Sequence, residues 1–458
     1  MPHHSQRPDD GRAPARRPNR LTRSAAPAGF LDAWHQLLGD AECPTPPRGP
    51  GRPARVPLTQ LLPALTFHVM QGPGTLGEHF EELFGEPFAD SSWADRRARL
   101  PWDIFAELMR RMLRRQATRS RHAEAFWHGW RLLALDGTQF SLTNTPQVRR
   151  TVRKARSRRG RAAFAKLPTA VLLEVGLHNP IAAAMGRHGE SEWALAQTLL
   201  DQVPAGALLL ADRLYGCPAF VAPLQVICDH VGSHFLIRAQ RVVKGRVLRQ
   251  LRDGSRILEV SLRRPVRPTP EMTTLTVREI RAQIGRPGHR ATEVRLWTSL
   301  MDPTEAPALD LAQLYARRWE EELYFREVKR HVRRGDLLQS HTVDTGAQEI
   351  AAIVLASALL AVERARIANG TVPPLRVSFA KMLRVVEGMW FTLDVAAPVL
   401  TEAQTQYVLT RMDERMRRYL TPPRRARSCP RAVRQPVTGW PRLMKAESIE
   451  GPFECTIV

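Results

Sequence analysis

The chain is poor in cysteine, and its few cysteines do not form pairs spaced for metal binding. They number five and are scattered, at Cys43, Cys217, Cys228, Cys429 and Cys455. Zinc sites and redox motifs use closely spaced cysteine pairs, and small secreted scaffolds use a dense disulfide framework. Neither kind of site is therefore supported, and a reducing cytoplasmic environment is the expected location.

Long hydrophobic runs are also missing, as is any phosphate-binding glycine loop. The longest apolar run, Ile350–Val362, is bounded by Glu349 and Glu363. A membrane-spanning helix needs about 20 apolar residues, so this run predicts a buried helix instead. The amino terminus is charged and proline-rich, without the apolar segment of a signal peptide. No GxxxxGK[ST] sequence occurs, so we expect neither a membrane partner nor a nucleotide cofactor.

Acidic residues are too few to balance the basic ones. Lys and Arg together number 68 against 45 Asp and Glu, which gives a net charge of +23 and a pI near 11.1. A surplus of this size indicates a polyanionic partner, with DNA or RNA first and an anionic membrane second. Only six of the 68 basic residues are Lys, so a Lys at a motif position carries more weight than an Arg.

Composition and periodicity divide the chain into five parts. Residues 1–28 are rich in Arg, Pro and Ala and are expected to be disordered. Residues 29–128 are expected to form a basic helical segment, which begins with helices over Phe30–Leu38 and Leu58–Met70. Residues 129–340 mix strands with helices and carry a strand-rich insertion at about 241–300; residues 341–420 are helical and 421–458 form a basic tail. Strands and helices in this order predict an α/β layer fold with a buried central sheet, flanked by helical regions.

One stretch, Leu311–Leu337, predicts a long helix with a distinctive polar face. Its apolar residues recur every three or four positions, and no Pro or Gly interrupts it before residue 335. Tyr315, Arg318, Glu322 and Lys329 fall within an arc of about 60°. A carboxylate can hold a divalent ion and the cations beside it can hold phosphates, although a salt-bridged amphipathic helix would also fit this stretch alone.

Two buried strands upstream each end in an aspartate. They are Arg131–Asp136 and Ala207–Asp212. Open α/β sheets place reactive groups at the carboxyl ends of strands, although either Asp alone could serve as a turn or cap residue. Brought together with Glu322, the three carboxylates would repel one another unless a cation lay between them. Two divalent ions about 3.5–4 Å apart polarise both the attacking and the leaving oxygen of a phosphodiester.

These residues carry a resemblance to a known family. Tyr315, Arg318, Glu322 and Lys329 match a Tyr-(2)-Arg-(3)-Glu-(6)-Lys signature at every position. The sequence resembles bacterial insertion-sequence transposases of the DDE class, in the branch named for this signature. The blocks that begin at Asp136 (Asp-Gly-Thr) and Asp212 (Asp-Arg, then Tyr-Gly) are similar to the other two motifs of the family, and the resemblance covers roughly residues 30–435, as expected of a full-length member.

The resemblance implies an RNase H-like catalytic core in which Asp136, Asp212 and Glu322 bind the metal. It implies Mg²⁺ as cofactor, with Mn²⁺ as a substitute and two ions in each site. The reaction would be hydrolytic cleavage at the ends of the element, followed by attack of the freed 3′-hydroxyl on target DNA. The implied partner is double-stranded DNA, both the terminal inverted repeats of the element, which the 29–128 domain would bind, and the target DNA. A second copy of the chain is also implied, giving a homodimer on DNA. The implied location is the bacterial cytoplasm, in association with the nucleoid.

The same resemblance assigns DNA-binding roles within the long helix. Arg318 and Lys329 would bind phosphates near the cleaved end, and Tyr315 would pack or hydrogen-bond there. The residue before the catalytic glutamate is commonly apolar in the family, whereas this chain has Glu321, which leaves Glu321 as an alternative to Glu322.

Further DNA contacts are expected outside this helix. Arg158 and Arg159 lie in the densest basic run, Arg149–Arg161, which predicts a phosphate-binding loop or a merely solvated stretch. Arg213 could bind phosphate or neutralise nearby acids. Trp297 could hold a flipped base, as in some relatives, or pack as an ordinary strand residue.

Two other functions remain open from the sequence. The chain could be a catalytically inactive or regulatory DNA-binding derivative of a transposase, or a metal-dependent nuclease that cuts without joining. An intact set of three acids argues against the first, and strand transfer separates a transposase from the second.

Overall fold

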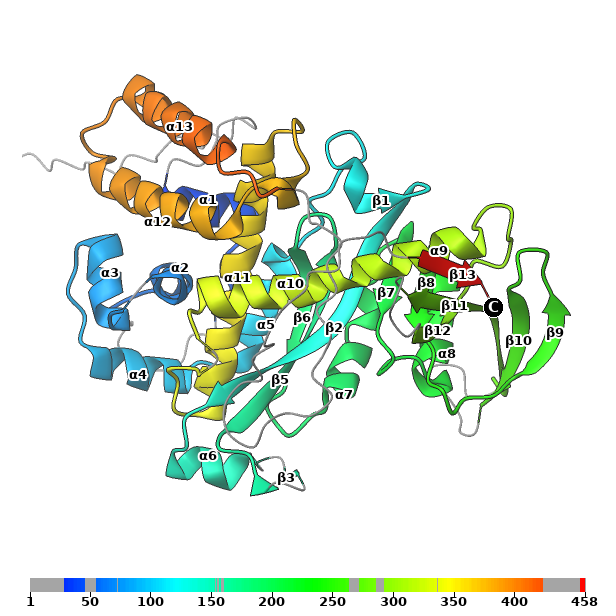
Figure 1. Ribbon diagram of the computed structural model, residues 1–458. Coiled ribbons are helices and arrows are strands. Elements are labelled where there is room, and N and C mark those ends of the chain that lie inside the picture. Colours follow the sequence, from blue (N-terminus) through cyan, green and yellow to red (C-terminus); the bar gives the residue numbers. More distant parts are fainter. Residues whose placement is uncertain are drawn as a thin grey trace, which may run out of the picture.

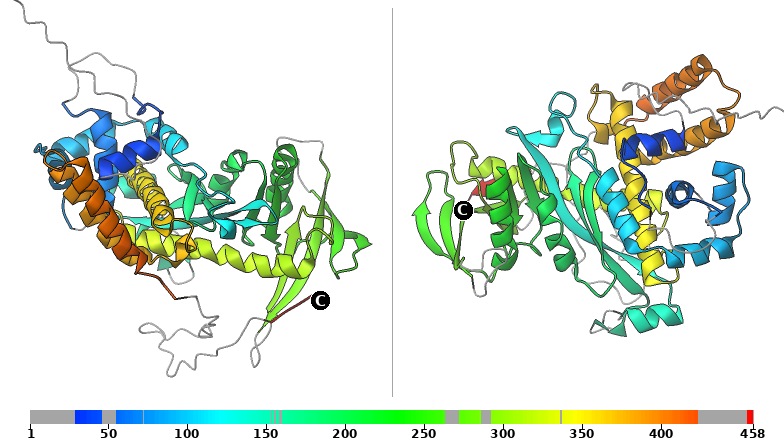
Figure 2. Two further views of the ribbon diagram at one scale, coloured as in Figure 1. Left: turned by 90° about the horizontal axis from the view of Figure 1, so that it is seen from above. Right: turned by 180° about the vertical axis from the view of Figure 1, so that it is seen from behind.

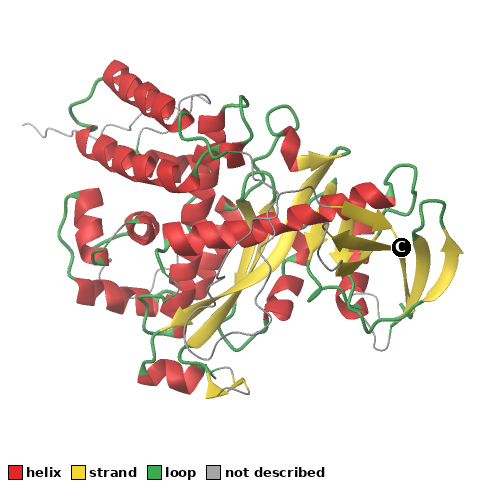
Figure 3. Ribbon diagram, viewed as in Figure 1, coloured by secondary structure: helices red, strands yellow, loops and turns green. Residues whose placement is uncertain are grey.

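An 11-stranded mixed sheet forms the centre of the molecule, which is described here from a computed structural model (Figures 1 and 3). The structure describes residues 29–45, 55–71, 73–152, 154, 156–157, 160–262, 272–285, 292–335, 337–422 and 454–457. The predictions for residues 1–28, for Arg158 and Arg159 and for most of the 421–458 tail lie outside the described residues. Helices cover both faces of the sheet and form a body beside it, so the predicted α/β class is confirmed.

Five strands form one half of the sheet. They are β2 (Trp130–Leu142), β5 (Ala165–Glu174), β6 (Asn179–Met185), β7 (Ala207–Ala211) and β8 (His234–Arg238). Their spatial order is β6-β5-β2-β7-β8, in which β5 runs antiparallel to both neighbours and β7 and β8 run parallel to β2. Three consecutive strands followed by two parallel strands on the other side of the first strand are the topology of the RNase H-like fold.

The strands expected within residues 241–300 extend this same sheet. They are β9 (Arg246–Gln250), β10 (Arg256–Ser261), β11 (Thr274–Gly285) and β12 (Thr292–Thr298). β12 pairs antiparallel with β8, so the insertion continues the sheet and does not form a separate one. The short strands β1 (Phe126–Trp127) and β13 (Glu454–Ile457) pair with β2 and β11, and β3 (Arg156–Ser157) pairs with β4 (Gly160–Arg161) apart from the main sheet.

Alternating side chains of the central strands point into two different cores. The covering helices are α7 (Glu192–Gln197), with the 3₁₀ turn Leu200–Gln202, and α8 (Pro218–Val231) on one face, and α9 (Ala308–Tyr315) on the other. Leu133 and Leu135 of β2 belong to the core that includes α7 and α8. Leu132 and Ala134 belong to the core that includes α9. The period of two along β2 therefore sets which residues face which layer.

The helical body contains both the amino-terminal and the carboxy-terminal helices. It comprises α1 (Phe30–Leu38), α2 (Leu58–Met70), α3 (Leu76–Phe84), α4 (Asp90–Arg99), α5 (Trp102–Met112), α11 (Val343–Ala368), α12 (Phe379–Ala396) and α13 (Glu402–Arg417). α1 and α2 have the predicted bounds. The helices share one hydrophobic core around α11, and the Phe30 N–H donates to the Asp394 carboxylate over 2.9 Å. The two predicted helical regions are thus packed together (Figures 1 and 2).

Among the described residues, no helix combines the length and the apolar composition that a bilayer crossing requires. The apolar run Ile350–Val362 lies within α11, where nearly every side chain is buried against the other helices of the body. The prediction of a buried helix at this run is confirmed.

The helix predicted over Leu311–Leu337 is continuous but not uniform. α9 passes through a 3₁₀ turn at Ala316–Arg318 into α10 (Trp319–Glu327), which ends in a π-helical turn at Val328–Val332. Arg334 then has a left-handed backbone (φ 59°), which stops the helix before residue 337. The prediction of one long helix is therefore confirmed up to Val332, and its predicted end at Leu337 is wrong. Figure 1 shows α10 crossing the sheet from the insertion towards α11.

Candidate active site

Asp136 lies in the middle of β2 and not at its end, which corrects the predicted strand boundary. β7 ends at Ala211, opposite Leu135, whereas β2 continues to Leu142 paired only with β5. Asp136 is therefore the first residue of β2 that has no β7 neighbour. The loss of one neighbouring strand, and not the end of its own strand, opens the space in front of its carboxylate.

Asp136 and Asp212 emerge side by side on the same face of the sheet. Ala134 and Leu210, two residues before each Asp, both belong to the core that α9 covers. They are also partners in the parallel register of β2 and β7. Since side chains alternate along a strand, both aspartates point to the layer that contains α9 and α10. The parallel register of β2 and β7 is thus consistent with the expectation that the carboxylates of Asp136 and Asp212 lie close together.

Arg318 links Asp136 to Glu322 across this space. Its Nη1 donates to Asp136 Oδ2 over 3.3 Å and its Nη2 donates to Glu322 Oε1 over 3.0 Å. The Arg318 side chain is only 11% exposed, whereas that of Glu322 is 40% exposed. Arg318 therefore acts as the built-in counter-ion of the two acids, and Glu322 is the acid most open to a ligand.

A cleft of about 720 Å³ lies between β2 and α10. Asp136 and Glu322 line one part of it, together with the backbone of Gly137. Four basic residues also line it, namely Arg326, Lys329, Arg330 and Arg334, together with Thr138, Phe325 and Gly335. Carboxylates beside a basic rim can hold a cation and an anionic backbone at once.

Two residues of the predicted signature have clear structural partners. Lys329 Nζ donates to the Gln139 carbonyl over 2.8 Å and lies over the Phe140 ring, 5.3 Å from its centre. The Tyr315 hydroxyl donates to the Ala211 carbonyl over 3.2 Å and is buried. Tyr315 thus fixes the helix over the end of β7, whereas Lys329 faces the cleft.

Burial has the largest effect on the electrostatics of Asp136. Burial raises the pKa of Asp136 to about 7, and the charges of Glu192 and Asp212 act in the same direction. The Gly137 N–H, 2.9 Å from Asp136 Oδ1, and the Arg318 guanidinium oppose this shift. Arg318 does not neutralise the acids fully, so the site would gain from an added cation.

The donor atoms fit a hard divalent ion, although the carboxylates do not point to one common position. All candidate ligands are carboxylate oxygens, which are the ligands that Mg²⁺ and Mn²⁺ prefer. Within the described ranges, no three His, Cys, Asp or Glu side chains lie close enough together to hold a metal ion. Arg318 occupies the space between Asp136 and Glu322 instead.

Two further acids lie close to Asp136, namely Glu321, which the sequence left as an alternative to Glu322, and Glu192, which it did not assign to the site. Glu321 is fully buried, and no side chain among the described residues hydrogen-bonds its carboxylate, although the backbone N–H of Asp136 lies close enough to lower its pKa. Burial raises the pKa of Glu321 well above its usual value, and the charge of Asp136 adds to this. Glu192, at the start of α7, accepts a hydrogen bond from the Tyr215 hydroxyl over 3.1 Å. The run of three acids at 320–322 was the only sequence signal for Glu321, and Glu192 had none.

Two other predicted DNA-binding residues that the structure describes, Arg213 and Trp297, do not line the cleft. Arg213 is exposed in the turn after β7. Trp297 is fully buried in β12, with its Nε1 3.4 Å from Glu279 Oε2, which agrees with the packing alternative and leaves no ring face open to a base. Arg158 and Arg159 lie outside the described residues.

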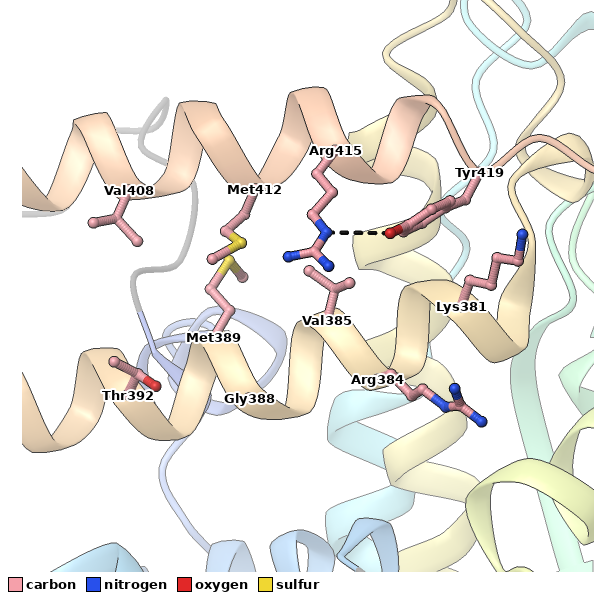
Figure 4. A pocket seen from close by; sticks show the side chains of 10 residues that line it. All are labelled: Lys381, Arg384, Val385, Gly388, Met389, Thr392, Val408, Met412, Arg415 and Tyr419. Atoms are coloured by element: carbon pink, nitrogen blue, oxygen red, sulfur yellow. Dashed lines mark hydrogen bonds between the residues drawn. The ribbon is translucent and has the colours of Figure 1, made fainter.

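A second hollow, of about 640 Å³, separates α12 from α13 (Figure 4). Met389 and Met412 face each other across it, and Arg415 extends between the two helices, where its Nε donates to the Tyr419 hydroxyl over 3.1 Å. None of its lining residues is acidic. The chemistry expected of the three acids therefore belongs to the cleft at Asp136.

Comparison with known proteins gives matches along most of the chain. The family model "Transposase DDE domain" matches residues 127–359. The transposase InsG for insertion sequence element IS4 of Escherichia coli (strain K12) is 25% identical over 328 residues, which cover 70% of this chain and 71% of InsG. The protein InsZ of the same organism is 31% identical over 106 residues, 22% of this chain and 36% of InsZ.

One solved structure is also similar in outline. A piggyBac transposase synaptic complex with hairpin DNA aligns over 86% of both chains, with 11% identity and a TM-score of 0.45. The family model spans just over half of the chain and includes Asp136, Asp212 and Glu322. The chain belongs to the transposase DDE domain family, whose members are enzymes that use divalent metal ions to cleave DNA and transfer its strands.

Proposed function

We propose that this DNA transposase cuts at the ends of an insertion sequence and joins the freed 3′-hydroxyl ends to target DNA. The observation that carries the proposal is the cleft in which Asp136 and Glu322 share Arg318 beside a basic rim. The substrates would be the terminal inverted repeats of the element and target DNA in the bacterial cytoplasm. A homodimer would hold two DNA ends together.

We propose that Asp136, Asp212 and Glu322 are the carboxylates that bind the divalent cofactor. The cofactor would be Mg²⁺, for which Mn²⁺ could substitute, and each site would hold two ions. The bound cofactor would polarise the phosphodiester and lower the pKa of a bound water molecule towards neutral pH. Arg318 would have to release at least one of its two acid partners when the cation binds, and its guanidinium could then pair with a DNA phosphate. The same side chain thus serves as counter-ion before loading and as phosphate ligand afterwards.

Removal of the cofactor gives the most direct test of this assignment. EDTA in excess is expected to abolish cleavage of an inverted-repeat fragment, and added Mg²⁺ or Mn²⁺ is expected to restore it. Binding of the fragment, measured by gel shift in EDTA, should persist because basic residues that need no metal supply most of it. Cleavage that continues in EDTA would contradict the metal assignment.

Lys329→Ala is expected to weaken engagement of the DNA end in the cleft. A charge-assisted hydrogen bond contributes about 1.5–3 kcal/mol, so the cleavage rate at subsaturating DNA should fall about 10- to 100-fold. The matched control is Lys381→Ala, which removes a lysine from the groove between α12 and α13 (Figure 4). Equal losses in both variants, or no loss in Lys329→Ala, would show that Lys329 has no specific phosphate role.

A further inference from the structure

α9 begins the continuous helix that carries Arg318 and Glu322, but its first turn has no cap from a neighbouring residue. Its N-cap residue, Pro307, makes no side-chain hydrogen bond. The first N–H groups of a helix have no partner within the helix and need one from elsewhere. α9 continues through a 3₁₀ turn into α10, so the contacts that fix its start also help to place Glu322.

Asp253, in the turn between β9 and β10, supplies the missing cap. Its Oδ2 accepts a hydrogen bond from the Ala308 N–H, at the first residue of α9, over 2.9 Å. Its Oδ1 accepts from the N–H and the hydroxyl of Ser255, over 3.2 and 2.6 Å, which holds the turn itself. A carboxylate at this end of a helix also interacts favourably with the helix dipole. The hairpin at the edge of the sheet is therefore joined directly to the start of α9.

Arg278 holds Asp253 and the approach to α9 in one place. It lies in β11, is fully buried, and donates to the Asp253 carboxylate. Its guanidinium also donates to the carbonyl oxygens of Leu300 and Ala306, over 3.0 and 2.7 Å. Both carbonyls belong to the loop that leads from β12 into α9. A guanidinium presents its donors in a rigid planar fork, so these contacts set the loop and the cap in a fixed relation.

The two ends of α9 are thus fixed by different parts of the sheet. Asp253 binds its first residue, and Tyr315, its last residue, donates to the Ala211 carbonyl at the end of β7. Loss of the first anchor would let α9 tilt about the second, which would move Glu322 relative to Asp136. A displacement of about 1 Å at the reacting groups can lower a rate about 100-fold.

We propose that Asp253 and Arg278 are positioning residues for the reaction, through which the insertion sets the place of Glu322 opposite Asp136. Neither residue lines the cleft, so each acts through α9 and not by contact with DNA there. The insertion thus does more than extend the sheet, because it anchors the helix that carries the proposed catalytic glutamate. The inference rests on the proposed function, since the rate that it concerns is that of DNA-end cleavage.

The test is the single-turnover rate of DNA-end cleavage by the full chain, measured with Mg²⁺ on a labelled inverted-repeat fragment from the flanks of the gene. Asp253→Ala should lower this rate about 10- to 100-fold, because α9 loses the anchor of its first turn. The affinity for the fragment, measured by gel shift in EDTA, should stay at the wild-type value. The matched control is Glu259→Gln in the same hairpin, which removes an ion pair with Arg246 that does not involve α9 and should keep the wild-type rate.

A second variant separates positioning from stability. Asp253→Ala alone leaves Arg278 buried without its acid, which destabilises the chain. The double variant Asp253→Ala/Arg278→Met leaves no unpaired buried charge at this place. It should therefore unfold at a temperature near that of the wild type, as measured by thermal unfolding, and still show the loss in cleavage rate.

The outcomes separate this inference from the proposed function. A wild-type rate in the double variant, with cleavage lost in Glu322→Gln, would overturn the positioning role and leave the proposed function standing. An equal loss of rate in Glu259→Gln would also overturn it, as would a DNA affinity reduced as much as the rate, because the hairpin would then act by binding DNA. Absence of cleavage by the wild type in Mg²⁺ and in Mn²⁺ would overturn the proposed function and this inference with it.

Discussion

Glu322→Gln is expected to lower the rate of DNA-end cleavage by about 10³-fold or more. A metal ligand supports several kcal/mol of transition-state charge stabilisation, and each 1.36 kcal/mol corresponds to about a tenfold change in rate. The substitution keeps the side-chain shape and the hydrogen bond from Arg318, so the loss would report the charge of the ligand. Gel-resolved cleavage of a labelled inverted-repeat fragment measures the rate.

The neighbouring acid provides the matched control for that variant. Glu321 points into the interior and is fully buried, whereas Glu322 lines the cleft. Glu321→Gln should therefore reduce the rate about tenfold at most, which is within the range for residues that act through others. The reverse ranking of the two variants would assign the catalytic glutamate to position 321.

Glu327→Gln is expected to produce the largest loss of stability, about 3–5 kcal/mol, because it leaves a buried cation without its partner. Glu327 accepts from His178 Nδ1 over 2.6 Å and from Arg364 Nη1 over 3.2 Å. The Arg364 side chain is only 4% exposed, so water cannot replace the lost carboxylate. This cluster joins the end of α10 to α11, and urea unfolding would measure the change.

An exposed ion pair on α13 provides the control for this stability effect. Glu414 accepts from Arg411 over 3.0 Å, and both side chains are largely open to solvent. Glu414→Gln should cost at most about 1 kcal/mol, as is usual for surface pairs. A loss in Glu327→Gln as small as that of the control would contradict the account of α10 anchoring.

The same cluster gives stability a defined pH window. The charges of Arg364 and His178, acting against burial, lower the pKa of Glu327 to about 2 from 4.5, so its contribution is complete above pH 4.5 and is lost as pH falls towards 2. The charge of Glu327 and the hydrogen bonds that His178 donates to Glu320 and Glu327, also acting against burial, raise the pKa of His178 above 6.5. Its contribution is complete below pH 6.5 and is lost as pH rises through the folded pKa.

The combined contribution of Glu327 and His178 should therefore be greatest between pH 4.5 and 6.5. His178→Gln should remove the decline on the alkaline side of this window. It should also reduce the decline on the acidic side, because the charge of His178 helps to lower the pKa of Glu327 and only that of Arg364 would remain. Urea unfolding of wild type and variant across pH 4–9 measures this difference. An unchanged alkaline limb in the variant would exclude His178 as its source.

Local patterns predicted much of the fold and the core of the candidate site. The bounds of α1 and α2 followed from apolar periodicity, and the spacing of Arg318 and Glu322 placed both on the face that meets the sheet. The length of β2 could not be predicted, because the end of β7 and the pairing with β5 together determine the surroundings of Asp136. The local run of apolar residues before Asp136 gave no sign of either.

Contacts between segments that are distant in the sequence could not be predicted. Glu192 meets Gly137 only because α7 packs beneath β2, and Arg318 meets Asp136 across 182 positions of chain. The merging of the amino- and carboxy-terminal helices into one body has the same cause, since nearly every residue of α11 is buried and helices from both regions pack against it. Such contacts depend on tertiary packing and leave no local pattern.

The most direct test of the central claim is a joining assay with purified protein, Mg²⁺ and a labelled DNA fragment from the flanks of the gene. The account predicts cuts at inverted repeats and joined products, both lost in Glu322→Gln with DNA binding retained. Joined products require a 3′-hydroxyl end held in the cleft, which a simple nuclease does not provide. Tight binding without cleavage in Mg²⁺ or Mn²⁺, or cleavage that survives in Glu322→Gln, would contradict the account.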